Sequence, residues 1–175
     1  MRPRLLACLV VVSFWPGTSL ALGKGEASLS GGVGLSVGAL DGARLGPSLE
    51  AKLLRGMSDA WAGRLGVQLA WLPTSSAAGD TFVALQELGF TWAADVVNLV
   101  PQLDLGLAVA TIAGGGAGAS ERLGPQLGIG ADYLLNRRWA LSGFAHVDYL
   151  PLRIAGSHRS ASLLATFSLD LTRYF

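Results

Sequence analysis

Few residues in this sequence have the type and spacing that enzyme chemistry requires. His146 and Asp148 pair an imidazole with a carboxylate two positions later, as a general base and its orienting acid would be. Ser157, His158 and Ser160 supply hydroxyls and a second imidazole further along. A nucleophile must lie within hydrogen-bond reach of its base, which sequence spacing alone does not establish. The alternative interpretation is that His146 pairs structurally with Asp148 and that His158 is solvated.

Other reactive motifs are missing. The single cysteine, Cys8, lies in a segment that we expect to be removed, so thiol chemistry, disulfides and cysteine metal sites are excluded from the mature chain. The sequence contains no EF-hand spacing, His-rich tract or zinc signature, and we predict no required metal or cofactor. Gly114-Gly115-Gly116 is not followed by Gly-Lys-Ser/Thr and therefore predicts a flexible loop, not a phosphate site.

The first 21 residues have the pattern of a secretory signal peptide. Two arginines precede an apolar run, and a small-x-small triplet follows it: Arg2, Arg4, Leu5 to Trp15, Ser19-Leu20-Ala21. We predict cleavage after Ala21, which leaves residues 22–175 as one domain. An uncleaved anchor helix is disfavoured because Pro16-Gly17 interrupts a short apolar run. Lipoprotein processing at Cys8 would leave too few residues ahead of the cysteine.

The composition indicates a membrane protein. Hydrophobic residues make up 51% of the chain and charged residues only 14%, which is apolar for a soluble protein. Removing Arg2 and Arg4 from 13 basic residues leaves 11 against 12 acidic ones, a net charge of −1. The sequence has no polybasic patch, so a nucleic-acid partner is not expected.

Period-two alternation dominates after residue 22, and no run of about 18 uncharged apolar residues occurs there. Leu103, Leu105 and Leu107, for example, alternate with Asp104 and Gly106. This pattern predicts an all-β fold, an eight-stranded antiparallel transmembrane β-barrel with up-and-down meander order. The expected strands are 27–40, 43–56, 60–73, 80–94, 101–113, 122–135, 138–150 and 160–175. Prolines 47, 73, 101, 125 and 151 are expected near strand ends, not in mid-strand.

Aromatic spacing supports a membrane barrel. Three pairs of aromatic residues stand ten positions apart, which at about 3.3 Å per residue and about 40° of tilt projects to roughly 25 Å, the height of an outer-membrane apolar band. We therefore predict aromatic girdles made by Trp61, Trp71, Phe82, Trp92, Tyr133, Trp139 and Tyr149. A soluble β-sandwich would place its polar face outward and would not bury acids at equivalent depths.

The same register predicts a polar network in the barrel lumen. The inward charges are Glu50, Lys52, Arg64, Glu87, Asp104, Asp132, His146, Asp148 and Asp170. Eight strands enclose an interior just wide enough for side chains, so these charges are expected to pair and plug the lumen. Small inward residues, such as Gly34, Gly106 and Gly128, leave a narrow wet passage as the alternative.

An even strand count places both termini in the periplasm and alternates outer loops with shorter periplasmic turns. Outer loops are expected near 41–43, 73–81, 113–122 and 151–159. Arg137-Arg138 would lie in a periplasmic turn, either solvated or in contact with lipid headgroups or a partner.

Two segments resemble the OmpA/OmpX-like family of small outer-membrane barrels. Residues 130–141, Gly-Ala-Asp-Tyr-Leu-Leu-Asn-Arg-Arg-Trp-Ala-Leu, are similar to the family's penultimate hairpin. The chain ends with a pattern similar to the signal that the barrel assembly machinery recognises: Phe167, Leu169, Leu171 and Phe175. Arg173 departs from the hydrophobic residue usual at its position. The resemblance implies residence in the outer membrane of a Gram-negative bacterium, in contact with lipid and lipopolysaccharide.

Family resemblance leaves the role open, because members differ in function. We expect a non-enzymatic structural component, or a subunit of an envelope assembly with a protein partner. One alternative is a narrow pore or transporter. Another is a lipid-A-modifying enzyme, since some similar barrels use a histidine followed two residues later by a serine. Here Asp148 occupies that serine position, so the nucleophile is missing.

Overall fold

The computed structural model describes residues 22–39, 43–74, 79–96, 98–114, 118–156 and 162–175. Within these ranges the chain forms β-strands and no helix that is long and apolar enough to cross a membrane. The strands are β1 (Ala27–Ala39), β2 (Ala43–Gly56), β3 (Trp61–Leu72), β4 (Thr81–Ala93), β5 (Leu99–Gly114), β6 (Ser120–Asn136), β7 (Trp139–Leu150), β8 (Leu152–Gly156) and β9 (Ser162–Tyr174).

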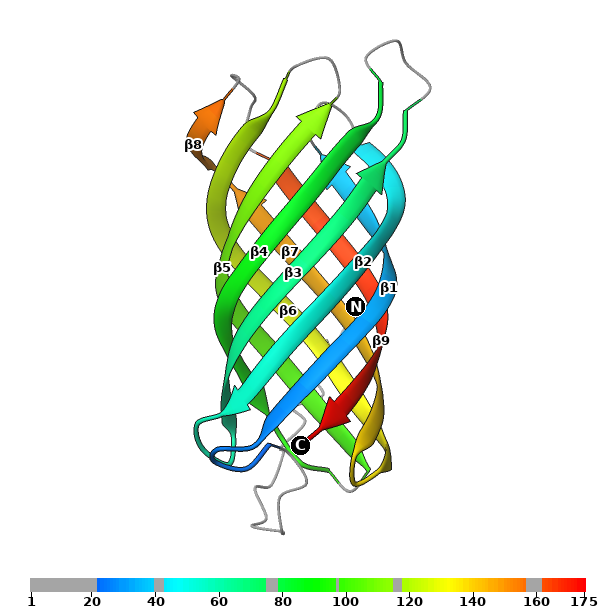
Figure 1. The fold of residues 1–175 in the computed structure, drawn as a ribbon, viewed down its shortest axis with the longest axis vertical. Helices are drawn as coiled ribbons and strands as arrows, with labels where there is room; N and C mark the ends of the chain where they lie inside the picture. The colour runs from blue at the N-terminus through cyan, green and yellow to red at the C-terminus, as the bar shows by residue number, and fades with distance from the viewer. Residues whose placement is uncertain (1–21, 40–42, 75–78, 97, 115–117, 157–161) are drawn as a thin grey trace, which may run out of the picture.

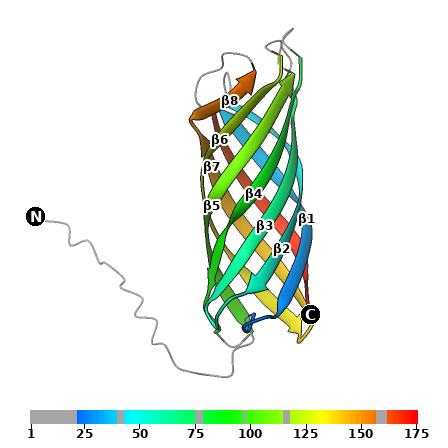
Figure 2. The same ribbon diagram turned by 60° about the vertical axis from the view of Figure 1, so that its left-hand side comes forward.

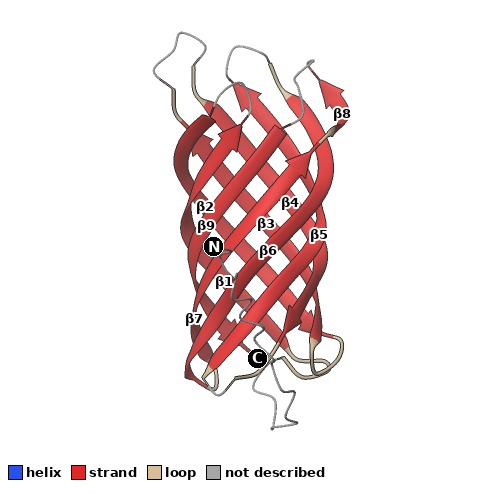
Figure 3. Cartoon of the chain, turned by 180° about the vertical axis from the view of Figure 1, so that it is seen from behind, coloured by secondary structure: helices blue, strands red, loops and turns tan. Residues whose placement is uncertain are grey.

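Eight of these strands close into a barrel. Each pairs antiparallel with its neighbour in the chain, and the ring closes where β1 pairs with β9 and β5 with β6 (Figures 1 and 3). The eight-stranded antiparallel meander expected from the sequence is confirmed. The short strand β8 stands outside the ring and pairs only with β6 (Figure 2).

The alternation of residue types determines which side of each strand faces the lumen. In β3, residues at even positions are buried, whereas Leu65, Val67 and Leu69 are more than half exposed. Exposed large hydrophobic residues recur on the barrel wall along every strand. A contiguous apolar surface of this kind is suited to lipid and not to water.

The strand boundaries agree closely with the expected ones, with one correction. The segment 151–159 was expected to be an outer loop, but Leu152–Gly156 forms β8. The reason is that β6 continues beyond the end of β7, and its otherwise open edge pairs with β8 through Ser120↔Gly156 and Leu123↔Leu152. Part of this connection therefore extends the sheet above the barrel rim.

The prediction that no proline lies in mid-strand was wrong for Pro47 and Pro125, which lie inside β2 and β6. Each stands directly before the first residue that pairs with the next strand, Ser48 with β3 and Gln126 with β7. The ladder on that side has ended at the proline, so a missing N–H is tolerated there.

The two halves of the barrel share an internal repeat. Residues 44–73 and 122–151 align without a gap, and nine of the thirty positions are identical, including Arg-Leu-Gly-Pro at the start and Leu-Pro at the end. The strand registers agree as well, since Leu49↔Leu69 in β2–β3 corresponds to Leu127↔Val147 in β6–β7. The hairpins β2–β3 and β6–β7 are therefore equivalent elements of the ring.

The barrel has two distinct ends. Strands β1, β3, β5 and β7 end, and strands β2, β4, β6 and β9 begin, at one end of the barrel, here called the loop end and drawn uppermost in Figure 1. Residues 57–60, 94–96, 98 and 137–138, which lie between consecutive strands, are at the other end, the turn end. The carboxyl terminus also lies at the turn end, where Phe175 N donates to Ala27 O at 2.9 Å. Of the predicted Gly114-Gly115-Gly116 loop, only Gly114 lies within the described residues.

The repeat gives a stability prediction for Gly46 and Gly124. A Cβ on Gly46 would stand 1.7 Å from Trp71 O, and one on Gly124 would stand 1.7 Å from Tyr149 O. Because the obstacle is backbone, we expect Gly46→Ala and Gly124→Ala each to lower the free energy of unfolding by about 2 kcal/mol or more. Urea unfolding in micelles, followed by tryptophan fluorescence, measures this loss.

Gly63→Ala and Gly143→Ala are the matched controls, since a Cβ at these positions meets its nearest atom at 3.7 and 3.8 Å. Equal stability of all four variants would contradict the close-approach explanation.

Candidate functional site

The lumen holds all nine charged residues that the register placed inside. Glu50, Lys52, Arg64, Glu87, Asp104, Asp132, His146, Asp148 and Asp170 are each at most 8% exposed. They gather into groups at different depths. The buried Gln68 and Gln126 and the partly buried Tyr174 join these groups, and Arg122 is buried nearer the loop end. The sequence reasoning missed these four, although the parity of their strands already pointed them inward.

Lys52 is the centre of the first group. Its Nζ lies 2.7 Å from Glu50 Oε1 and 3.6 Å from Asp170 Oδ2. The same ammonium stands 3.8 Å from the ring centroid of Phe144, which projects from the far side of the barrel. Ser168 Oγ donates to Glu50 Oε1 at 2.5 Å. Two carboxylates and an aromatic face thus contact one buried cation, and the Ser168 hydroxyl binds one of the two carboxylates.

Arg64 is the centre of the second group. Its Nη1 donates to Glu87 Oε2 at 2.9 Å and lies 3.4 Å from Asp104 Oδ2. Its Nη2 donates to Gln126 Oε1 on β6, which is not a neighbour of β3 in the ring. Thr91 Oγ1 donates to Asp104 at 2.6 Å. The guanidinium on β3 therefore contacts side chains from three other strands, β4, β5 and β6.

His146 lies between these groups. Its Nε2 is 2.9 Å from Gln68 Oε1, 3.9 Å from Glu87 Oε1 and 3.8 Å from Asp148 Oδ2. Gln68 and His146 occupy equivalent positions of the internal repeat, on strands at opposite sides of the ring. Their hydrogen bond crosses the lumen at mid-depth.

At the turn end a smaller polar group closes the interior. Tyr174 Oη donates to Asp132 Oδ2, and the hydroxyls of Ser142 and Thr172 lie 2.7 Å apart. A cavity of about 20 Å³ opens beside Tyr174, Thr91 and neighbouring residues, room for roughly one water molecule.

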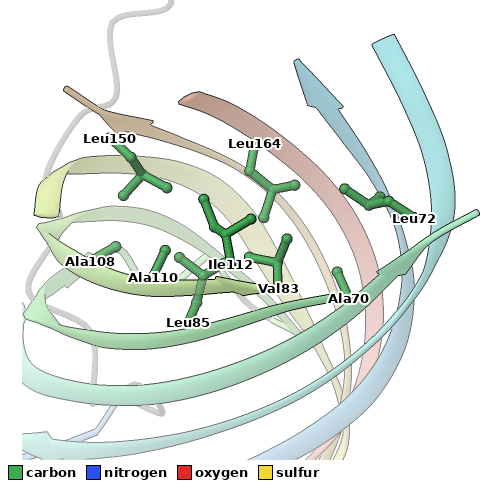
Figure 4. Packing of buried hydrophobic residues seen from close by; sticks show 9 residues of the cluster. All are labelled: Ala70, Leu72, Val83, Leu85, Ala108, Ala110, Ile112, Leu150 and Leu164. Carbon is green, nitrogen blue, oxygen red and sulfur yellow. The ribbon is translucent and has the colours of Figure 1, made fainter. Parts of the chain in front are cut away.

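Toward the loop end the lumen is apolar. The cluster shown in Figure 4 consists of Ala70, Leu72, Val83, Leu85, Ala108, Ala110, Ile112, Leu150 and Leu164. Leu72, Ile112 and Leu164 project from three strands toward the same space (Figure 4). Above them, Arg44 Nη1 donates to Thr81 Oγ1 at 2.7 Å, and Arg122 Nη1 donates to Leu150 O at 3.3 Å. This layer lies between the loop end and the charged groups around Lys52, Arg64 and His146.

The predicted aromatic girdles stand at the two ends of the wall. The turn end carries Trp61, Trp92, Tyr133 and Trp139, and the loop end Trp71, Phe82 and Tyr149. Trp61 faces Trp92 across β3–β4, and Trp71 faces Phe82. Arg173 at the turn end lies over the rings of Trp139, at 5.6 Å, and of Phe175, at 4.9 Å. Its position in the girdle accounts for the departure from a hydrophobic residue there.

The terminal residues Phe167, Leu169, Leu171 and Phe175 point outward, between 49% and 64% exposed. A shallow apolar groove of about 570 Å³ crosses the wall of β1 to β5 on the loop-end half, lined by Leu49, Leu69, Trp71, Phe82, Ala84 and Ala113 among others. Its floor is made of small side chains between larger ones.

Among the described residues, the groups in contact with the His146 ring nitrogen are the amide of Gln68 and the carboxylates of Glu87 and Asp148. The hydroxyls of Ser36 and Thr166 contact Gln68. The other candidates, Ser157, His158 and Ser160, lie outside the described residues.

Comparisons with known proteins agree with this architecture. The chain is similar to Neisserial surface protein A, with a TM-score of 0.76, 11% identity and coverage of 87% of this chain and 100% of that one. For OprG from Pseudomonas aeruginosa the TM-score is 0.63 and the identity 13%, over 89% of this chain and 98% of that one. For Ail, the attachment invasion locus protein of Yersinia pestis, the TM-score is 0.56 and the identity 15%, over 87% of this chain and 99% of that one.

No protein-family model matches the chain, and no curated protein sequence is significantly similar to it. At these identities the likeness concerns the fold. The closed ring, the apolar wall and the structural neighbours together define the fold, an eight-stranded antiparallel transmembrane β-barrel like those of these outer-membrane proteins.

The Arg64 group gives a second stability prediction. Arg64→Met leaves Glu87 and Asp104 buried without their cation, so we expect a loss of about 3 kcal/mol or more in the free energy of unfolding. Adding Glu87→Gln to that variant removes one of the two unpaired buried charges and should recover part of the lost free energy of unfolding. Urea unfolding in micelles tests both variants.

Arg55→Met is the control, because Arg55 is an exposed arginine of β2, and it should change stability by less than about 0.5 kcal/mol. An Arg64→Met barrel as stable as the wild type would contradict the proposed dependence on the ion pairs.

Proposed function

We propose that this protein is a non-conducting, non-enzymatic barrel of the Gram-negative outer membrane, serving as a structural component or as a subunit of an envelope assembly. The carrying observation is the blocked lumen. Bonds from Arg64 to Gln126 and from His146 to Gln68 cross its middle, and an apolar layer closes it toward the loop end. With the interior filled, the lipid-facing wall and the loop end are the surfaces left for interactions.

In this proposal both termini are periplasmic and the loop end faces outward. The orientation is supported by the short turns at the end where Phe175 meets the start of β1, since periplasmic turns of such barrels are the shorter ones. The cleaved signal peptide of residues 1–21, which lie outside the described residues, is part of the same proposal.

The partners in this proposal are lipid and lipopolysaccharide, the barrel assembly machinery during biogenesis, and an envelope protein. Outward-facing Phe167, Leu169, Leu171 and Phe175 support contact with the assembly machinery, because they stay accessible on the wall. The girdles and the wall groove support contact with the bilayer.

The narrow-pore and lipid-A-enzyme alternatives are not favoured. Two of the inward glycines that suggested a wet passage lie against the polar side chains of the lumen, since a Cβ on Gly106 would stand 3.2 Å from Arg64 Nη2 and one on Gly128 would stand 3.2 Å from Asp104 Cβ. His146 is only 3% exposed, in mid-lumen, where a lipid substrate has no access.

Because the lumen is blocked, we expect the barrel to carry no ion current across planar bilayers. The purified wild-type barrel should give no steady single-channel conductance. A steady conductance that falls when Ala110→Phe fills the apolar layer, but not with the wall variant Ala51→Phe, would assign the current to the lumen and contradict the proposal.

A subunit role predicts a stoichiometric partner. The tagged barrel, pulled down from gently solubilised outer membranes and quantified by mass spectrometry, should recover one protein near one-to-one. Recovery of the barrel alone would contradict the subunit role and favour a self-sufficient structural component. The same pull-down with a tagged unrelated barrel identifies background proteins.

A further inference from the structure

Three side chains with metal-ligating atoms converge in the middle of the lumen. Glu87 comes from β4, and His146 and Asp148 come from β7, three places away in the ring. His146 Nε2 lies 3.9 Å from Glu87 Oε1 and 3.8 Å from Asp148 Oδ2, and all three ligand atoms lie within 4.8 Å of one another. Ligand bonds of about 2.0–2.2 Å to one ion hold ligand atoms roughly 3–4 Å apart. Small side-chain rotations therefore bring all three onto one ion.

Asp148 carries the second, independent observation. It is 0% exposed, and within the described part of the chain neither Oδ1 nor Oδ2 accepts a hydrogen bond. A buried carboxylate normally has a hydrogen-bonding partner, an ion pair or a metal. Within the described residues, the basic side chain within 4 Å of it is the imidazole of His146, on the same strand and at 3.8 Å.

The surrounding lumen has an excess of acidic groups. Among the described residues, six buried carboxyl groups face three buried cationic side chains, Lys52, Arg64 and Arg122. Arg64 binds Glu87 through Oε2 only, which leaves Oε1 directed toward His146. A divalent cation at this point would offset part of the excess and meet the free oxygens of both carboxylates.

The neighbouring amide is already oriented toward the same point. Gln68 Nε2 donates to Ser36 Oγ at 3.0 Å and to Thr166 Oγ1 at 2.8 Å, so Oε1 is the atom that faces His146 Nε2. Without a metal, Nε2 must carry the proton of that hydrogen bond. Metal binding moves this proton to Nδ1 or to solvent and makes Gln68 Oε1 available as a fourth ligand atom, the third oxygen.

We propose that Glu87, His146 and Asp148 bind one divalent first-row transition-metal ion, such as Zn²⁺ or Mn²⁺, inside the barrel. An imidazole among carboxylates favours such ions over Mg²⁺, which prefers oxygen ligands and retained water. The ion would be structural, because the apolar layer and the Asp132–Tyr174 pair separate it from both ends. Loading is therefore expected as the barrel closes. The site does not depend on the proposed function.

The test refolds the untagged barrel from a chelator-washed, unfolded state into micelles that contain ZnCl₂, followed by desalting and metal analysis by mass spectrometry. We expect about one zinc ion per wild-type barrel, and at least about tenfold less in Asp148→Asn and His146→Gln. Asp132→Asn, which changes a buried carboxyl group paired with Tyr174 outside the cluster, should retain the ion. Circular dichroism establishes that each variant is folded.

A measurement on the wild type alone tests the proposal even if the variants do not fold. Refolding with CoCl₂ should give d–d absorption distinct from that of cobalt in empty micelles. A cobalt spectrum identical to that of empty micelles, fewer than about 0.1 zinc ions per wild-type barrel, or equal zinc in wild type and Asp148→Asn would overturn the proposal. Displacement of zinc by a hundredfold excess of Mg²⁺, about the excess a transition-metal site resists, would overturn the assigned class of ion.

Discussion

The pairing of β1 with β9 is the interaction on which the rest of the structure depends. It runs from Ser28↔Tyr174 to Ala39↔Leu163 and turns an open sheet into a ring. In a bilayer each unpaired backbone group costs several kcal/mol, so an open edge along these strands would be untenable. Closure with eight strands also sets a narrow interior. The inward charges must therefore be satisfied by one another, by hydrogen bonds or by an ion.

The barrel combines a repeated frame with an unrepeated interior. The hairpins β2–β3 and β6–β7 share register, close glycine contacts and terminal Leu-Pro. Inside, the equivalents differ, since Glu50 and Lys52 correspond to Gly128 and Gly130, and Ala70 to Asp148. Backbone closure constrains both hairpins in the same way, whereas the two sides of a shared lumen must complement each other. These glycines leave room for side chains of the adjacent strands, Gly128 for His146 and Asp104 and Gly130 for Phe144.

The filled lumen and the apolar layer oppose transport through the barrel but leave its outer surfaces free to interact. Transport would require displacing the cross-lumen bonds of Arg64 and Gln68 together with the layer around Ile112 and Leu164. Interactions through the wall and loop end require no such change. The structural neighbours share this architecture while differing in name and sequence, so the fold by itself assigns no role.

The sequence by itself determined the strand number, the meander order and the inward charges, because period-two alternation and aromatic spacing are local signals that a membrane enforces. It did not predict β8, or that Pro47 and Pro125 lie within strands. Both features depend on the residue at which pairing with a neighbouring strand stops. Only the tertiary structure decided which charges meet. Arg64 and Gln126, or Glu87 and His146, lie on strands whose relative depth is set by the accumulated stagger of the closed ring. No spacing along one chain encodes that depth directly.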